Sequence, residues 1–326
     1  MIEGTVAAQF AAVGEAAEGC DVIVGGGALA IAAHSVSEKL GIRYEYASFA
    51  AITLPSSQHP PLILPMAGWQ PKDPEAGNLA LWAEDAEHWN ELWAGALNSQ
   101  RAKVGLAPVD DVRRHIFTDT PWLAADPTLG PWLPADDEVV TVTQTGAWIL
   151  PDQRPLSVEL EEFLDAGEAP VYFGFGSMRA SGDLSKTLIA AGRALGRRAV
   201  VARGWAGLAL PDDGTDILSI GEVNQQELFK RVALAVHHGG AGTTTAAGGA
   251  GVAQVIVPQM YDQFYWANRV TQLGIGAAHA PGVPTVESLA EVLDAALQAQ
   301  VGKRAKEIQQ DVRLDGADAA AKLLLG

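Results

Sequence analysis

The chain has 326 residues, a formal net charge of −17, 48% hydrophobic residues and 19% charged residues. This length exceeds what one hydrophobic core usually holds, so it predicts two domains, and the composition excludes a largely disordered chain. The acidic balance argues against a general nucleic-acid-binding protein, which is expected to be basic.

The cellular setting follows from what the sequence lacks. A single cysteine, Cys20, excludes an intramolecular disulfide, which is typical of a reducing cytoplasm. No apolar run reaches the roughly 18 residues of a membrane helix. Residues 1–10 lack the basic start and apolar run of a signal peptide. We therefore expect a cytoplasmic monomer that binds neither membranes nor nucleic acids.

The first half of the chain alternates strand and helix patterns around a proline-rich stretch. Six prolines between residues 51 and 77 disfavour regular structure there, and a loop of this length is usually functional or mobile. Strands are predicted at residues 21–24 and 42–47, helices at 28–40 and 79–103, and an extended segment at 139–150.

The second half alternates more regularly and with shorter connections. Such alternation predicts an α/β fold with parallel sheets in doubly wound layers. The predicted strands are residues 171–175, 199–202, 217–220, 234–237, 254–257 and 275–279. The predicted helices are residues 157–164, 184–195, 225–232 and 262–273, followed by three helices that close the chain.

The strongest functional signal is the sequence HHGGAGTT at residues 237–244, where a strand passes through glycines directly into a helix. Glycines let the backbone approach a ligand closely, and a helix N-terminus favours a phosphate. His238 can donate a hydrogen bond to that phosphate, and Thr243 and Thr244 can add hydroxyl donors. A tight turn without a ligand stays open as the alternative. The motif is not a P-loop, because no lysine follows the last glycine.

Two further turns follow predicted strands. The sequence GFGS at residues 174–177 can bring Ser177 against the same diphosphate, although a plain turn would have the same sequence. The sequence PQMYDQ at residues 258–263 opens a helix. Asp262 and Gln263 there suit hydrogen bonds to vicinal sugar hydroxyls, and the alternative for Asp262 is a helix N-cap.

A third glycine cluster and one tryptophan suggest other ligands. Residues 25–27 are three glycines after a strand, as in a dinucleotide-binding fingerprint, which leaves an NAD-dependent oxidoreductase as an alternative. We favour a structural turn there, because the third glycine of the fingerprint is missing. Trp69, inside the proline-rich loop, is the candidate contact for a large aromatic ligand.

With these residues in view, the chain resembles the bacterial glycosyltransferases that decorate glycopeptide antibiotics of the vancomycin and teicoplanin type. The matching motifs run in order through nearly the whole chain. They are NSQR (98–101), TDTPWLAADP (118–127), QTGAWILPD (144–152), GFGS (174–177), RGW (203–205), GEVN (221–224), HHGGAGTT (237–244) and PQMYDQ (258–263).

The resemblance implies the GT-B architecture, in which two Rossmann-like domains face a cleft. Residues 1–150 would bind the acceptor, a glycopeptide aglycone, and residues 151–326 the nucleotide sugar. It also implies an inverting transfer in which a base deprotonates an acceptor hydroxyl that attacks the anomeric carbon. No cofactor and no metal are expected, because the helix dipole and His238 would stabilise the leaving diphosphate.

The family motifs also imply roles for single residues. His238 and Asp262 would serve catalysis, and Trp69 would contact the acceptor. The implied donor-binding residues are Ser177, Arg203, Trp205, Val223, His238, Gly240, Gly242, Thr243, Asp262 and Gln263.

The chain departs from the family pattern at its start. Family members open with a strand and a loop of the type Gly-Ser-x-Gly-Asp, whose Asp is the base, and residues 1–10 hold nothing similar. The first strands of the acceptor domain and the base are therefore expected upstream of Met1. This leaves two alternatives: a catalytically impaired nucleotide-sugar-binding protein, and a transferase for a macrolide or aromatic polyketide. Asp262 and Gln263 suit a fully hydroxylated hexose such as glucose, so UDP is the preferred carrier and dTDP the second choice.

Overall fold

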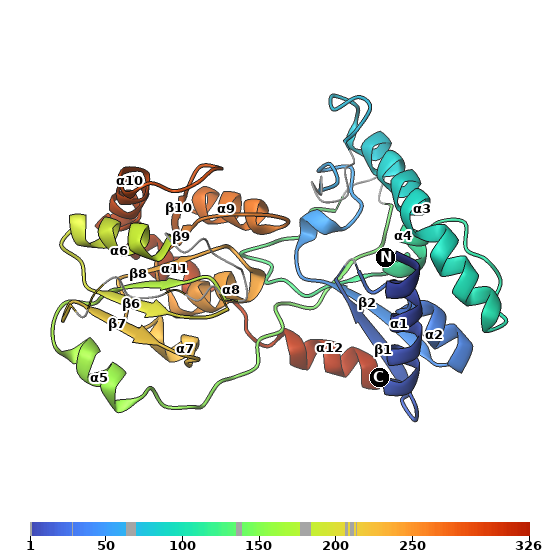
Figure 1. Cartoon of the computed structure of the whole chain (residues 1–326), viewed down its shortest axis with the longest axis horizontal. Coiled ribbons are helices and arrows are strands. Elements are labelled where there is room, and N and C mark those ends of the chain that lie inside the picture. Colours follow the sequence, from blue (N-terminus) through green and yellow to red (C-terminus); the bar gives the residue numbers. More distant parts are fainter. Residues whose placement is uncertain are drawn as a thin grey trace. The chain divides into compact units, whose positions relative to one another are not determined.

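The computed structural model describes residues 2–27, 29–62, 70–134, 139–176, 184–205, 208, 212 and 214–326. The chain divides into two compact units (Figure 1). The first unit comprises Met1–Ala125 and Pro131–Gly146, and the second comprises Asp126–Gly130 and Ala147–Gly326.

The first unit contains a parallel sheet of four strands in the order β1-β2-β3-β4. Its strands are β1 (Val22–Gly26), β2 (Arg43–Ser48), β3 (Trp122–Leu123) and β4 (Thr143–Gln144). Its helices are α1 (Ile2–Ala16), α2 (Ala33–Leu40), α3 (Asn78–Lys103) and α4 (Val112–Phe117), with a 3-10 turn η1 (Ala51–Thr53). Side chains from α1 and α2, with Ile23 of β1, form one of its apolar clusters.

Several sequence predictions for the first unit need correction. The helix predicted at residues 28–40 begins only at Ala33, and its N-cap residue, Ala32, makes no side-chain cap hydrogen bond. The segment predicted as extended at 139–150 joins the sheet over only two residues, the strand β4, and forms one isolated bridge between Trp148 and Asp315. The proline-rich stretch, where no regular element was predicted, contains the short 3-10 turn η1. The elements α1, α4 and β3 were not predicted at all.

The second unit contains a parallel sheet of six strands in the order β10-β9-β8-β5-β6-β7. Its strands are β5 (Val171–Gly174), β6 (Ala199–Ala202), β7 (Ile217–Ile220), β8 (Leu234–His237), β9 (Gln254–Ile256) and β10 (Gly276–Ala278). Its helices are α5 (Val158–Asp165), α6 (Leu184–Ala194), α7 (Gln225–Leu228), α8 (Ala241–Ala250), α9 (Gln263–Gln272), α10 (Val286–Ala296), α11 (Ala299–Gln309) and α12 (Gly316–Leu325). The prediction of a doubly wound α/β fold is confirmed.

Helices cover both faces of this sheet (Figure 1). One buried apolar cluster joins α6 and α10 to the sheet, and a second joins α5, α7 and α8 to it. The order of strands reverses between β5 and β8, and the helices that follow these two strands lie on opposite faces. Ligands of doubly wound sheets bind in the crevice outside the carboxyl ends of the strands at such a reversal.

The segment Asp126–Gly130 is bonded into the second unit although it precedes part of the first unit in sequence. The buried Asp126 carboxylate accepts the backbone N–H groups of Thr128, Leu129 and Arg313 at 2.8–3.0 Å. Arg269 donates to the carbonyls of Thr128 and Leu129. Five residues from the middle of the chain are thereby fixed against the helix α9.

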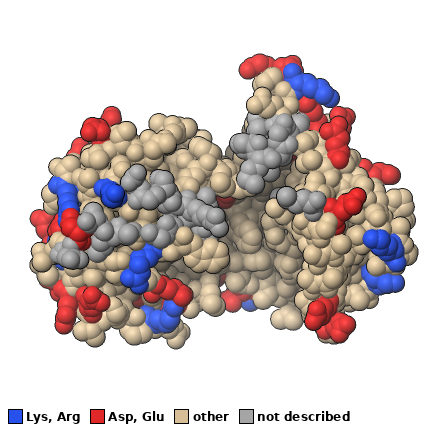
Figure 2. Space-filling model, in the orientation of Figure 1, with Lys and Arg blue, Asp and Glu red and all other residues tan. Residues whose placement is uncertain are grey.

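Charged side chains are scattered over both units on the face drawn in Figure 2. Acidic groups outnumber basic ones in the sequence, at 39 against 22. Among the described residues, no helix combines the length and the apolar character needed to cross a membrane.

Candidate functional site

The glycine turn between β8 and α8 opens an α-helix directly after a buried strand. Gly240 takes the N-cap position of α8, and the first-turn N–H groups of this helix have no carbonyl partner within it. Gly242 is exposed, and no atom lies within 4 Å of where its Cβ would be. The start of α8 therefore presents free donors at an open backbone surface, as an anion site requires.

One expected donor in this turn is occupied. The Thr244 hydroxyl is buried and donates to the Gly240 carbonyl at 3.0 Å, so it cannot reach a ligand as expected from the sequence. Thr243, one residue earlier, is half-buried.

Turns after three strands meet at this point. A Cβ added to Gly176, after β5, would lie 3.3 Å from Cε1 of His238, after β8. A Cβ on Gly204, after β6, would lie only 2.5 Å from the Gly176 carbonyl oxygen, and that oxygen accepts the Trp205 N–H at 2.8 Å. Gly176 and Gly204 both have positive φ, which favours glycine. The sheet thus brings together two turns that the sequence singled out separately, those after β5 and β8, and adds the turn after β6 that contains the RGW motif.

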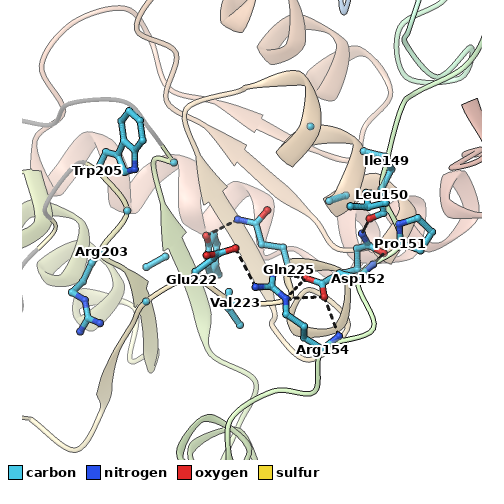
Figure 3. A pocket seen from close by; sticks show the side chains of 18 of the residues that line it. Ile149, Leu150, Pro151, Asp152, Arg154, Arg203, Trp205, Glu222, Val223 and Gln225 are labelled. Atoms are coloured by element: carbon cyan, nitrogen blue, oxygen red, sulfur yellow. Dashed lines mark hydrogen bonds and ion pairs between the residues drawn. The ribbon is translucent and has the colours of Figure 1, made fainter. Parts of the chain in front are cut away.

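A cavity of about 860 Å³ lies beside these turns, within the second unit. Its walls come from the carboxyl ends of the strands and from the segment before α5. Figure 3 shows Arg203 and Trp205 on one side of it and Arg154 with Asp152 on the other. Of the predicted donor-binding residues that the structure describes, those lining the cavity are Arg203, Trp205, Val223 and Gly242.

Two predicted residues in this cavity are exposed. The Trp205 side chain is 82% exposed, which is unusual for a large apolar ring. The exposed Arg203 guanidinium makes no hydrogen bond or ion pair within the described part of the chain. A free indole and a free cation are the groups that a nucleobase and a phosphate would engage.

The opposite wall is held by a polar network that the sequence did not reveal. Arg154 pairs with Asp152 at 2.7 Å and with Glu222 at 3.1 Å (Figure 3). The buried Asn224 caps α7 and donates to the carbonyls of Asp152 and Arg154. The polar residues in the motifs GEVN (221–224) and QTGAWILPD (144–152) were the sequence signal that could have indicated this network.

Asp262 occupies the N-cap position of α9 but makes no side-chain cap hydrogen bond, so the cap-only alternative is wrong. Its Oδ2 instead accepts the indole N–H of Trp266 at 3.0 Å. Burial raises the pKa of the Asp262 carboxyl, and the Trp266 hydrogen bond opposes that rise. Trp266 was not among the residues predicted from the sequence, although its spacing of four residues from Asp262 on one helix indicates that the two side chains are neighbours.

Gln263 has a structural role beside the one predicted for it. Its buried side-chain oxygen accepts the N–H groups of Gln259 and Met260 at 2.7 and 3.1 Å. The intervening Tyr261 has φ of 54°, a strained conformation for a residue other than glycine. Gln263 therefore holds the turn that presents Asp262.

His238 packs over the glycines of the turn. A Cβ on Gly240 would lie 2.7 Å from its Nε2. Its buried Nδ1 has no partner among the residues that the structure describes. Burial lowers the pKa of His238, so the imidazole is neutral at pH 7 and carries one N–H donor.

Two predicted site residues fall outside the described residues. Ser177 belongs to the stretch 177–183, and Trp69 belongs to the stretch 63–69. Their roles as a diphosphate donor and an acceptor contact stay predictions.

The glycines at residues 25–27 have a packing explanation. A Cβ on Gly25 would lie 2.4 Å from the hydroxyl of Tyr44, so this glycine makes room for that ring. The next helix, α2, begins only at Ala33 instead of directly after the glycines. The turn therefore lacks the adjacent helix N-terminus on which dinucleotide binding depends.

Among the described residues of the first unit, one cluster has the donor atoms of a metal site: His34, Glu38 and His115. The Arg101 guanidinium donates to Glu38 and to Nε2 of His115. Burial, together with His34 and Arg101, lowers the pKa of His115 to about 3. A fixed cation among these groups disfavours a metal ion, and we regard the cluster as structural.

Comparisons with known proteins agree with this geometry. A family model described as "Erythromycin biosynthesis protein CIII-like, C-terminal domain" matches residues 209–319. Glycosyltransferase GtfE of Amycolatopsis orientalis is 50% identical over 323 residues, which cover 98% of this chain and 78% of that protein. Vancomycin aglycone glucosyltransferase of the same organism is 49% identical with the same coverage.

A crystal structure of the glycotransferase of kitacinnamycin has the same fold. It superposes with a TM-score of 0.68 at 18% identity, covering 98% of this chain and 80% of that one. The resemblance inferred from the motifs is thereby confirmed, as is the GT-B fold class. The chain belongs to the family of glycopeptide-antibiotic glycosyltransferases that includes GtfE and vancomycin aglycone glucosyltransferase.

Proposed function

We propose that the protein transfers a hexose, with inversion, from a nucleoside-diphosphate sugar to a hydroxyl of a glycopeptide aglycone. The observation that carries the donor half is the meeting of the β5, β6 and β8 turns at the start of α8. The acceptor half rests on the family, because 49% identity joins the chain to a protein named for the vancomycin aglycone.

In this proposal the cavity of the second unit holds the nucleoside. Trp205 stacks against the base beside Val223, and Arg203 approaches the diphosphate as a free cation. The diphosphate lies at the start of α8, where the backbone around Gly240 and Gly242 and the Thr243 side chain offer donors. Ser177 would add a hydroxyl from the β5 turn.

The sugar lies next to the turn that ends in Asp262 and Gln263. A carboxylate accepts hydrogen bonds from two vicinal hydroxyls, which favours glucose over a deoxysugar. As the acceptor oxygen attacks the anomeric carbon, the bond from that carbon to the phosphate oxygen breaks. The electron pair leaves with the diphosphate, whose charge the α8 N-terminus and the His238 N–H stabilise. The acceptor proton goes to a base that the described residues do not identify.

Product formation tests the proposal. The chain is incubated with UDP-glucose or dTDP-glucose and the vancomycin or teicoplanin aglycone, and products are identified by mass spectrometry. We expect a monoglucosylated aglycone, faster with UDP-glucose, and NMR of the new linkage should show a β configuration from the α-linked donor. Binding of UDP without any product would favour the catalytically impaired nucleotide-sugar-binding protein. A macrolide or aromatic polyketide as the only working acceptor would favour the other alternative.

A further inference from the structure

His237, the last residue of β8, is fully buried, and its imidazole contacts the glycine turn that follows this strand. Its Nδ1 lies 3.1 Å from the backbone nitrogen of Gly239, and its Nε2 lies 2.9 Å from Oε1 of Gln254. Nε2 of Gln254 in turn lies 3.3 Å from the Thr244 carbonyl oxygen. The side chains of His237 and Gln254 thus join the Gly239 N–H to the Thr244 carbonyl through one continuous chain of hydrogen bonds.

The chemistry of the partners fixes the direction of every bond. A backbone N–H can only donate, so Nδ1 of His237 is the acceptor for Gly239. The neutral ring then carries its proton on Nε2 and donates to the Gln254 oxygen, which leaves the Gln254 amide nitrogen to donate to the Thr244 carbonyl. Burial lowers the pKa of His237 to about 4, which keeps the ring neutral near pH 7.

The two ends of this chain bracket the proposed diphosphate segment. Gly239 lies at its start, with φ of 93°, and Thr244 is the fourth residue of α8. A Cβ on Gly239 would lie 2.7 Å from Ile256 and 3.2 Å from the Gln263 carbonyl oxygen, so the turn is also packed against the start of α9. A rotation at Gly239 would move His238 and the first turn of α8 together.

We propose that His237 is a positioning residue that, through its Nδ1, holds the Gly239 turn and the start of α8 in the conformation that receives the diphosphate. This inference rests on the proposed function of the second unit. His237 would touch no substrate atom. Its effect would reach the donor through the backbone of residues 239–243.

The two ring nitrogens can be separated by substitution. In His237→Asn the side-chain oxygen takes the place of Nδ1 and can accept from the N–H two residues on, as in an Asx turn. In His237→Gln the amide takes the place of Nε2, so the bond to Gln254 is kept and the acceptor for Gly239 is lost. His279→Gln is the control, since His279 is also buried and bonded, through Nε2 to Ser288, in the same unit.

Calorimetric titration with UDP and with dTDP measures the outcome, alongside thermal unfolding. We expect His237→Asn to keep its affinity within about threefold, and His237→Gln to lose about tenfold or more, because one buried N–H is left without its acceptor. His279→Gln should lower the unfolding temperature without changing affinity. Equal affinities for His237→Asn and His237→Gln, or losses that only track unfolding temperature, would overturn the proposal.

A second measurement needs no nucleotide. Amide hydrogen exchange of residues 239–244 should be faster in His237→Gln than in His237→Asn and the unsubstituted chain. Equal exchange in all three overturns the positioning role even if nucleotide binding fails. The unsubstituted chain could bind neither nucleotide while amide hydrogen exchange of residues 239–244 is still faster in His237→Gln than in His237→Asn. In that case the proposed function fails, and the role of His237 in holding the Gly239 turn stands. If His237→Gln does not fold, ¹⁵N NMR of the histidine rings decides, because a protonated Nδ1 on His237 contradicts the acceptor role.

Discussion

The hydrogen bond between Trp266 and Asp262 gives a pH test of the sugar site. Trp266 is buried, and its indole N–H donates to Oδ2 of Asp262 at 3.0 Å. The substitution Trp266→Phe removes this donor and keeps an aromatic ring in place. Because the bond favours the charged carboxylate, its loss should raise the pKa of Asp262 further above its ordinary range.

The size of this effect follows from the strength of such bonds. A hydrogen bond to a charged group contributes about 1.5–3 kcal/mol, and one pKa unit corresponds to about 1.4 kcal/mol. The pKa of Asp262 should therefore rise by about one to two units. If the carboxylate form binds the sugar, activity is lost as pH falls through this pKa, so the acidic limb of the profile moves to higher pH.

The assay is kcat/KM for the sugar donor measured across pH. Trp266→Phe also replaces the indole, which packs against Gly130, with a smaller ring. The loss of packing should lower the free energy of unfolding by about 1–3 kcal/mol. Trp89→Phe controls for this, because Trp89 is also buried and, like Trp266 beside Asp262, lowers the pKa of a buried carboxyl, that of Asp85 in the first unit. A Trp266→Phe profile that is lower at every pH but not displaced, or a displacement shared by Trp89→Phe, would refute the reasoning.

Three other substitutions, with Gly196→Ala as a control for the third, test the donor site. His238→Ala should slow transfer by about 10²-fold through loss of one charge-stabilising donor, measured as kcat at saturating donor, and unchanged turnover would refute its role. Asp262→Asn should impair use of the sugar donor while calorimetry finds UDP affinity nearly intact; if UDP affinity collapses, Asp262 is structural instead. Gly196→Ala should cost about 1 kcal/mol of stability, because its φ is positive, and Gly204→Ala should cost more, because its φ is positive and its new Cβ meets backbone. Only Gly204→Ala should also weaken UDP binding, because only there does the new Cβ meet the Gly176 carbonyl, and equal binding by both variants would contradict the clash.

The second unit was predictable almost residue by residue. The strands β6, β7 and β8 have the predicted bounds, because they are apolar runs and short breaks mark their ends. The first unit was less predictable. The alanines after the glycines at 25–27 favour a helix but do not indicate at which residue α2 begins. The strands β3 and β4 have two residues each, too few to give a periodic pattern.

The candidate site was predictable where its residues are close in sequence. The glycine turns and the Asp262 turn stand out because each is one short motif after one strand. The bonds that hold them were not predictable, because they depend on strand register. His237 meets Gln254 only because β8 pairs with β9, seventeen residues later in the chain.

The path of the chain through Asp126–Gly130 limits how such enzymes can be recombined. Because these residues are bonded to Arg269 and Arg313, the second unit is not encoded by one continuous piece of sequence. A chimera that exchanges only residues 147–326 between relatives would join a foreign α9 to the resident 126–130 segment. The resident Gly130 would then have to pack against a foreign side chain at the position of Trp266, whose indole bonds to Asp262. Exchanges of donor specificity should carry both pieces together.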